Sequence, residues 1–179
     1  MFDQITGLPA HPLIVHAAVV FTPLLIAVGL LYVVIPPLRR RIGWVLVILS
    51  LIAPAVVFAA KESGAKFKER QTAKGLGPGF LDRINEHQNL GDRLALLVYG
   101  LAATALILVL VDGALRRRRP ARTSESDTTA PTAPARKGGR GVLLALSVIL
   151  SLGVLGLGGA AGYYVYKTGD SGARMVWGS

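Results

Sequence analysis

Cysteine is absent from the 179-residue chain, and histidine occurs only three times. Without cysteine, the chain has neither a disulfide framework nor thiolate ligands for a metal. No phosphate-binding loop, no His-Glu-x-x-His zinc motif and no nucleophile elbow occurs in the sequence. These absences argue against catalysis by the chain itself. They leave the three histidines as the main candidates for a functional site.

Charged residues are missing from long stretches of the chain, which are apolar instead. Hydrophobic residues make up 52% of the sequence. Four runs are each long enough to cross a hydrocarbon core of roughly 30 Å, and they cover residues 13–35, 42–60, 94–111 and 142–166. His16 lies near the start of the first run and Asp112 directly follows the third, and no other acidic or basic side chain falls inside the runs. Ion-coupled transport is therefore disfavoured.

The runs predict an all-α fold, a four-transmembrane-helix bundle arranged as two tandem helical hairpins. We expect a single membrane domain over residues 1–179. Its helices should cover about 12–35, 42–60, 80–112 and 142–166, with an outer loop at 61–79 and a disordered cytoplasmic linker at 113–141. In the last helix, Gly158 and Gly162 have a small-xxx-small spacing. This spacing is typical of close helix packing, of a homodimer interface or of a flat ligand-binding face.

The net charge of +10 is concentrated in arginine clusters at residues 39–41 and 116–119. With four spans, both clusters lie on the same side, and the positive-inside rule assigns that side to the cytoplasm. Both termini are then extracytoplasmic. Tyr32 and Trp44 should form part of an interfacial aromatic belt near the first cluster. We expect a multi-pass protein of the cell (plasma) membrane, with the lipid bilayer and not nucleic acid as its partner.

The three histidines are predicted to lie near the outer face. His11 and His16 begin the first apolar run, and His87 precedes the third. Five residues along a helix separate two side chains by about 140°, so His11 and His16 cannot hold one ion from a straight helix. Counted in residues from the membrane edge, the height of His11 matches that of His87 better than the height of His16 does. The pair His11 and His87 is therefore predicted to form a haem or metal site, with His16 beside it. Structural hydrogen bonds between helices and solvation at the interface are the alternatives.

A short internal repeat follows the second and fourth helices. Residues 61–67 and 169–175 share the pattern acid-Ser-Gly-Ala-base-apolar. The acids Glu62 and Asp170 either hydrogen-bond the far nitrogen of a histidine or cap a turn at which the following glycine ends the helix. Ser63 and Ser171 are further candidates to support the histidines.

Three motifs resemble an uncharacterised bacterial membrane family, domain of unknown function 2231. Residues 7–16 resemble its opening HPxxVH signature, residues 86–91 its second histidine motif, and residues 170–177 the SGA…W ending of its actinobacterial branch. The match spans nearly the whole chain except residues 120–140. Many members have Phe-Pro after the second histidine, where this chain has Ala17 and Ala18. Relatives joined to Rieske or cytochrome c domains imply a link to membrane redox chemistry.

Two functional hypotheses follow. The first is an electron-transfer module that binds haem b or a transition metal at the histidines and exchanges electrons with a redox protein. The second is a non-catalytic membrane scaffold or accessory subunit that docks another protein through its outer loops.

Overall fold

A computed structural model of the chain describes residues 4–5, 8–75, 77–117 and 138–177. Four long helices dominate it: α1 (Ala10–Val34), α2 (Arg39–Ala73), α3 (Pro78–Arg117) and α4 (Gly138–Trp177). A 3-10 turn, η1 (Pro36–Leu38), joins α1 to α2. Two two-residue strands, β1 (Gln4–Ile5) and β2 (Leu8–Pro9), pair antiparallel before α1. The predicted all-helical bundle of four spans is confirmed.

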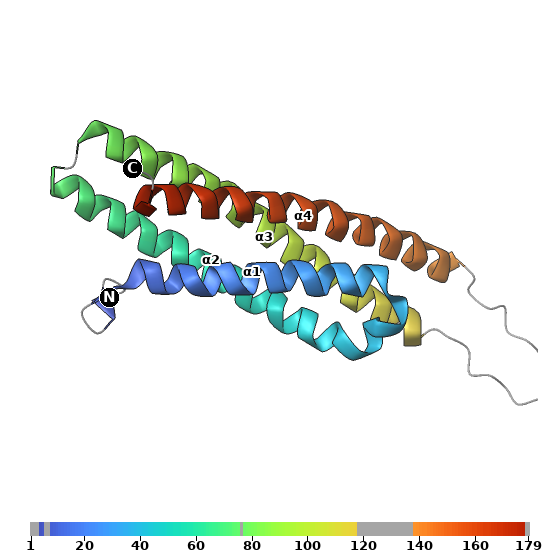
Figure 1. Cartoon of the computed structure of the whole chain (residues 1–179). Coiled ribbons are helices and arrows are strands. Elements are labelled where there is room, and N and C mark those ends of the chain that lie inside the picture. The colour runs from blue at the N-terminus through green and yellow to red at the C-terminus, as the bar shows by residue number, and fades with distance from the viewer. Residues whose placement is uncertain (1–3, 6–7, 76, 118–137, 178–179) are drawn as a thin grey trace, which may run out of the picture.

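The helices alternate in direction and form a bundle in which each helix packs beside the next along the chain (Figure 1). The ring closes because α1 also packs against α4. The chain thus consists of two antiparallel hairpins, α1–α2 and α3–α4, and both chain ends lie at the same end of the bundle. We call that end, which carries His11 and His87, the histidine end. The opposite end, which carries Arg39 and Arg116, is the arginine end.

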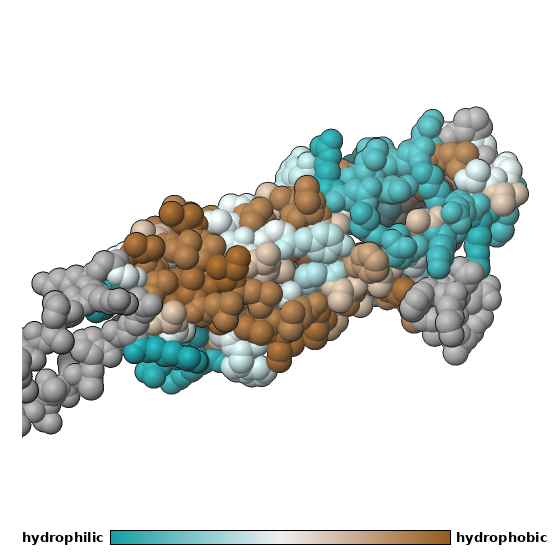
Figure 2. Space-filling model, turned by 180° about the vertical axis from the view of Figure 1, so that it is seen from behind, coloured by the Kyte–Doolittle hydropathy of each residue, from teal (hydrophilic) through white to brown (hydrophobic). Residues whose placement is uncertain are grey.

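Apolar side chains fill the bundle and also cover its outside. The interior is packed with residues such as Leu25, Leu46 and Leu101, while Leu96 and Leu110 on α3 are each 72% exposed. Figure 2 shows hydrophobic surface over the body of the bundle and a hydrophilic cap over the histidine end. A surface of this kind is stable in lipid, where helices satisfy all their backbone hydrogen bonds internally.

The helices at the histidine end are longer than the sequence predicted. The expected outer loop at 61–79 is largely absent, because α2 continues to Ala73 and α3 starts at Pro78. No proline occurs between 61 and 73, and the turn is made by Gly75, whose φ is 71°. At 40 residues each, α3 and α4 are roughly 60 Å long, about twice the hydrocarbon thickness. They therefore project beyond the membrane.

The predicted linker at 113–141 is also shorter than expected. Residues 113–117 belong to α3 and residues 138–141 to α4, while 118–137 lie outside the described residues. Of the small-xxx-small pair, only Gly158 makes a close contact: a β-carbon there would lie 3.7 Å from Ile26 and Leu30 of α1. At Gly162 no atom would lie within 4 Å. Gly158 therefore serves packing inside the bundle.

Candidate functional site

His11 is held by a serine on the neighbouring helix. Its Nδ1 atom lies 3.0 Å from the Ser63 hydroxyl oxygen on α2. That hydroxyl donates its only proton to the carbonyl oxygen of Ala60, at 2.9 Å. The hydroxyl oxygen therefore accepts a hydrogen bond from Nδ1–H of the imidazole. This assigns the neutral ring to the Nδ1–H tautomer and leaves the lone pair on Nε2.

His87 is held in the same way in the other hairpin. Its Nδ1 atom lies 2.8 Å from the Ser171 hydroxyl oxygen on α4. Ser171 donates to the carbonyl oxygen of Thr168, at 2.9 Å. The same reasoning assigns the Nδ1–H tautomer to His87. Both hairpins therefore present an imidazole whose Nε2 lone pair is not used by the serine.

A glycine next to each serine makes room for the imidazole ring. A β-carbon at Gly64 would lie 3.0 Å from Cε1 of His11, and one at Gly172 would lie 3.3 Å from Cε1 of His87. His11 also stacks on Phe67, with the ring centroids 5.9 Å apart. Each copy of the internal repeat thus holds one histidine through a Ser–Gly pair. The two pairs are Ser63–Gly64 and Ser171–Gly172. The expectation that each glycine ends a turn is wrong, because both lie inside continuous helices.

The two acids of the repeat do not contact the imidazoles. Glu62 is exposed, and Asp170 pairs with Arg174 at 3.0 Å, four residues further along α4. Successive residues of a helix point about 100° apart, so the acid and the serine that follows it face different neighbours. The structure therefore places the serine, and not the carboxylate, against each histidine.

His11 and His87 lie near enough to each other for the charge of one imidazole to act on the other. Burial lowers the pKa of the His11 imidazole, and the nearby charge of His87 lowers it further, against an opposing effect of the Ala60 carbonyl. His16 is exposed, one and a half turns further along α1. Within the described residues, no three histidine, aspartate or glutamate side chains are grouped as metal ligands. The described residues thus place two half-buried imidazoles, one on α1 and one on α3, at the histidine end.

A second polar cluster, at the arginine end, was not predicted as a site. The Asp112 carboxylate on α3 accepts hydrogen bonds from the Tyr32 hydroxyl (3.0 Å), from Arg39 (3.1 Å) and from the Ser147 hydroxyl (2.9 Å). These residues come from α1, α2, α3 and α4, one from each. Arg39 also donates to the carbonyl oxygens of Tyr32 and Val33, at 2.8 and 3.3 Å. We call these four side chains the Asp112 cluster.

The Asp112 cluster corrects the prediction for Tyr32. Its side chain is only 1% exposed, so it lies in the bundle and not in an interfacial belt. Trp44, by contrast, is 66% exposed, as a belt residue would be. The sequence signal that could have located the cluster was Asp112 itself. A lone carboxylate at the end of an apolar run needs a cationic partner, and the arginines at 39–41 share its side of the membrane.

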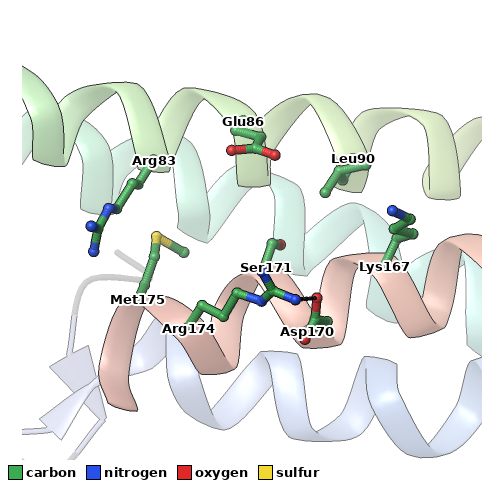
Figure 3. A pocket seen from close by; sticks show the side chains of 8 residues that line it. All are labelled: Arg83, Glu86, Leu90, Lys167, Asp170, Ser171, Arg174 and Met175. Atoms are coloured by element: carbon green, nitrogen blue, oxygen red, sulfur yellow. Dashed lines mark ion pairs between the residues drawn. The ribbon is translucent and has the colours of Figure 1, made fainter. Parts of the chain in front are cut away.

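A cleft of about 400 Å³ opens between α3 and α4 at the histidine end (Figure 3). Its lining is strongly charged, with the basic residues Arg83, Lys167 and Arg174 and the acids Glu86 and Asp170. Ser171, which holds His87, also lines the cleft. The cleft therefore lies directly beside one of the two histidines.

Four long apolar helices, an apolar outer surface and polar ends define an integral membrane protein of the four-helix-bundle type. The chain belongs to the family described as "Predicted membrane protein (DUF2231)", whose model matches residues 7–179. This confirms the resemblance seen in the histidine motifs. No curated protein matches the chain, and no solved structure does.

Proposed function

We propose that this protein is a membrane electron-transfer module that holds haem b or a transition metal ion between His11 and His87. One observation carries the proposal: two histidines, from different hairpins but at one end of the bundle, are fixed by identical Ser–Gly pairs with Nε2 left over. Two imidazoles that served only to join helices would not need the same nitrogen free on both.

The chemistry of the pair fits such a ligand. Neutral imidazole binds haem iron, copper and zinc, and a hydrogen bond to the opposite ring nitrogen fixes the tautomer and raises ligand basicity. Ser63 and Ser171 provide that hydrogen bond here. Burial lowers the pKa of the His11 imidazole, which favours the neutral ring that a ligand requires. Bound haem or metal would supply the one-electron chemistry, and the chain would supply position and two ligands.

The full-length protein, purified in mild detergent, tests the proposal. A haem Soret band, or one equivalent of a transition metal by elemental analysis, is expected in the parent protein. His11→Ala and His87→Ala should each abolish it, because two ligands are needed. His16→Ala is the matched control: it removes an exposed imidazole from the same end and should leave the cofactor in place.

A colourless and metal-free parent protein, or variants that all retain the cofactor, would overturn the proposal. That result would favour the alternative function, a scaffold that docks another membrane or redox protein at its histidine end. Circular dichroism of each variant separates loss of ligand from loss of fold.

We further propose that the protein lies in the plasma membrane with its histidine end outside the cytoplasm. The arginine clusters at residues 39–41 and 116–119, which lie at the α1–α2 and α3–α4 connections, support this orientation. The cysteine-free chain allows a direct test with single cysteines in cells. Lys74→Cys should react with a membrane-impermeant maleimide, and Arg117→Cys should not; the reverse pattern would refute the orientation.

A further inference from the structure

One face of α4 points into the bundle from the arginine end to the histidine end. Four residues on this face are spaced by seven positions: Ser147, Val154, Ala161 and Thr168. Seven residues make about two helical turns, so the four side chains share one face. The first three are no more than 7% exposed, and Ser147 donates a hydrogen bond to Asp112. Thr168 therefore holds the corresponding interior position at the histidine end.

The hydroxyl of Thr168 is buried and, among the described residues, has no hydrogen-bond partner. A threonine in a helix can bond the carbonyl oxygen four residues earlier, as Thr104 does with Gly100 at 2.7 Å. Thr168 does not use this option. Because an unpaired buried hydroxyl is unfavourable, its natural partner is a polar group from outside the chain.

Thr168 lies at the level of His87. Two hydrogen bonds fix the register of α3 against α4: His87 lies opposite Ser171, and Arg93 lies opposite Tyr164. Thr168 lies between Tyr164 and Ser171 on α4. It is therefore opposite the stretch of α3 between residues 87 and 93.

His11 lies beside the same stretch of α3. Its serine partner, Ser63, is two residues from Lys61 on α2, and Lys61 pairs with Asp92 of α3 at 3.0 Å. Thr168 and both histidines thus occupy one layer of the bundle.

Gly91 gives this layer its open space. Val98, Ala105 and Asp112 follow it at intervals of seven residues and are at most 5% exposed, so Gly91 turns the same face of α3 to the interior. A β-carbon at Gly91 would have no atom within 4 Å. The layer therefore combines two imidazoles, an unpaired hydroxyl and room beside them.

This combination fits a metal ion with a further ligand position better than it fits haem. A haem held by two histidines has both axial positions filled, and its apolar ring offers no partner to a buried hydroxyl. A metal ion bound by two imidazoles has further positions, which water or a small anion can fill. Resting on the proposed function, we propose that Thr168 hydrogen-bonds such a ligand of a metal ion held by His11 and His87, in the space beside Gly91.

Cobalt(II), added to the metal-free full-length protein in detergent, is the probe, because its visible spectrum depends on its ligands. Azide is the small anion, and it should change the cobalt spectrum of the parent protein in a saturable way. Thr168→Val removes only the hydroxyl, so it should weaken azide binding about tenfold while cobalt stays bound. Gly91→Val should fill the space and abolish the azide response.

Two comparisons separate this role from a structural one. Thr168→Ser keeps a hydroxyl and should retain azide binding. Thr72→Val is the matched control, because Thr72 is an exposed threonine of the same end that donates to the carbonyl oxygen of Lys68. It should bind azide like the parent. In the metal-free protein, Thr168→Val should not lower the unfolding midpoint, because the lost hydroxyl has no partner among the described residues.

An azide-insensitive cobalt spectrum, or an unchanged azide affinity in Thr168→Val or Gly91→Val, would overturn this inference. So would a lower unfolding midpoint of metal-free Thr168→Val, or haem b bound by both histidines in the purified protein. None of these results contradicts the two histidines as ligands, so the proposed function would stand. Failure of cobalt to bind, or binding that survives His11→Ala and His87→Ala, would instead overturn the metal site of the proposed function, and this inference with it.

Discussion

The two ends of this bundle use buried or half-buried polar side chains in opposite ways. At the arginine end, both oxygens of the Asp112 carboxylate accept hydrogen bonds, and its charge is neutralised by Arg39. At the histidine end, each imidazole is bonded through Nδ1 to a serine hydroxyl, and among the described residues no hydrogen bond to Nε2 is found. A saturated buried network gives rigidity, whereas an unsaturated one is costly unless a further group completes it.

The two ends also differ in which helices they connect. The Asp112 cluster draws one residue from each helix and so joins the two hairpins. The histidine contacts stay within hairpins, α1 to α2 and α3 to α4. Between hairpins, the histidine end has the Lys61–Asp92 ion pair, 3.0 Å long, and the hydrogen bond from Lys68 to Gln88, also 3.0 Å long, and both contacts are exposed. Exposed polar pairs contribute little, typically under about 1 kcal/mol each. The polar contacts between the hairpins are thus weaker at the histidine end than at the arginine end.

The largest expected effect is at the arginine end. Asp112→Ala leaves Arg39 without its carboxylate and two hydroxyls without an acceptor, so it should lower the free energy of unfolding by about 3–5 kcal/mol. Unfolding in detergent, followed by circular dichroism, measures this. Asp92→Ala is the control and should cost less than about 1 kcal/mol.

Similar stabilities of these two variants would show that the ends do not differ as described. If Asp112→Ala does not accumulate, the double variant with Arg39→Met and Asp112→Leu removes both charges together. It should recover a folded protein, since well-packed apolar residues often replace a buried ion pair without loss.

The next effect concerns the space reserved for His11. Gly64→Ala would put a β-carbon 3.0 Å from the imidazole, so the ring must move, at a cost of about 1–3 kcal/mol in the free energy of unfolding. Gly156→Ala, on α4, meets no atom within 4 Å and should be neutral or stabilising by up to about 1 kcal/mol. The thermal unfolding midpoints of the two variants, measured under the same conditions, test this difference. Equal midpoints would mean that Gly64 is not needed for the ring.

A smaller effect is expected for the serine that orients His87. Ser171→Ala removes the acceptor of the Nδ1 proton, a bond with a net value of about 1 kcal/mol. Nitrogen-15 spectra of the histidine-labelled protein should change from one tautomer to a mixture for one of only three histidines. Ser171→Thr keeps a hydroxyl and should keep the tautomer. If alanine and threonine variants give the same spectrum, the serine does not set the tautomer.

The smallest effect is a dependence of stability on pH. Because the pKa of His11 is lowered from 6.5 in the folded protein, the unfolded chain binds the proton more readily. Stability should therefore be complete above that pH and should decrease as the pH falls below it. Unfolding midpoints measured across this range should show a weaker acid dependence in His11→Gln than in the parent protein. An unchanged slope would place His11 in a more solvated setting.

The membrane architecture could be predicted from the sequence because it depends on local composition. Four apolar runs fix the number of helices in lipid, and the start of α3 was placed within two residues of Pro78. The extensions of α2 and α4 at the histidine end were underestimated. Polar residues such as those of 61–73 are compatible with either a loop or a helix, and packing against a neighbouring helix decides between them.

The repeated acid-Ser-Gly segments show where local reasoning stops. Their recurrence after α2 and α4 was visible, as was the placement of three histidines near one face. Which atom of the repeat meets the imidazole was not, because that depends on how each helix is rotated about its axis. The position of Asp112 at the end of an apolar run likewise indicates that its carboxylate needs a partner. It does not indicate that Tyr32, Arg39 and Ser147 all contact that carboxylate.

The sequence by itself therefore determined that this chain crosses a membrane four times and carries its histidines toward one end, since hydrophobicity and charge act residue by residue. Only the tertiary structure decided that serine and glycine hold each imidazole and that all four helices meet at a carboxylate. Contacts between residues up to 84 positions apart depend on the rotation and register of packed helices, which no local pattern encodes.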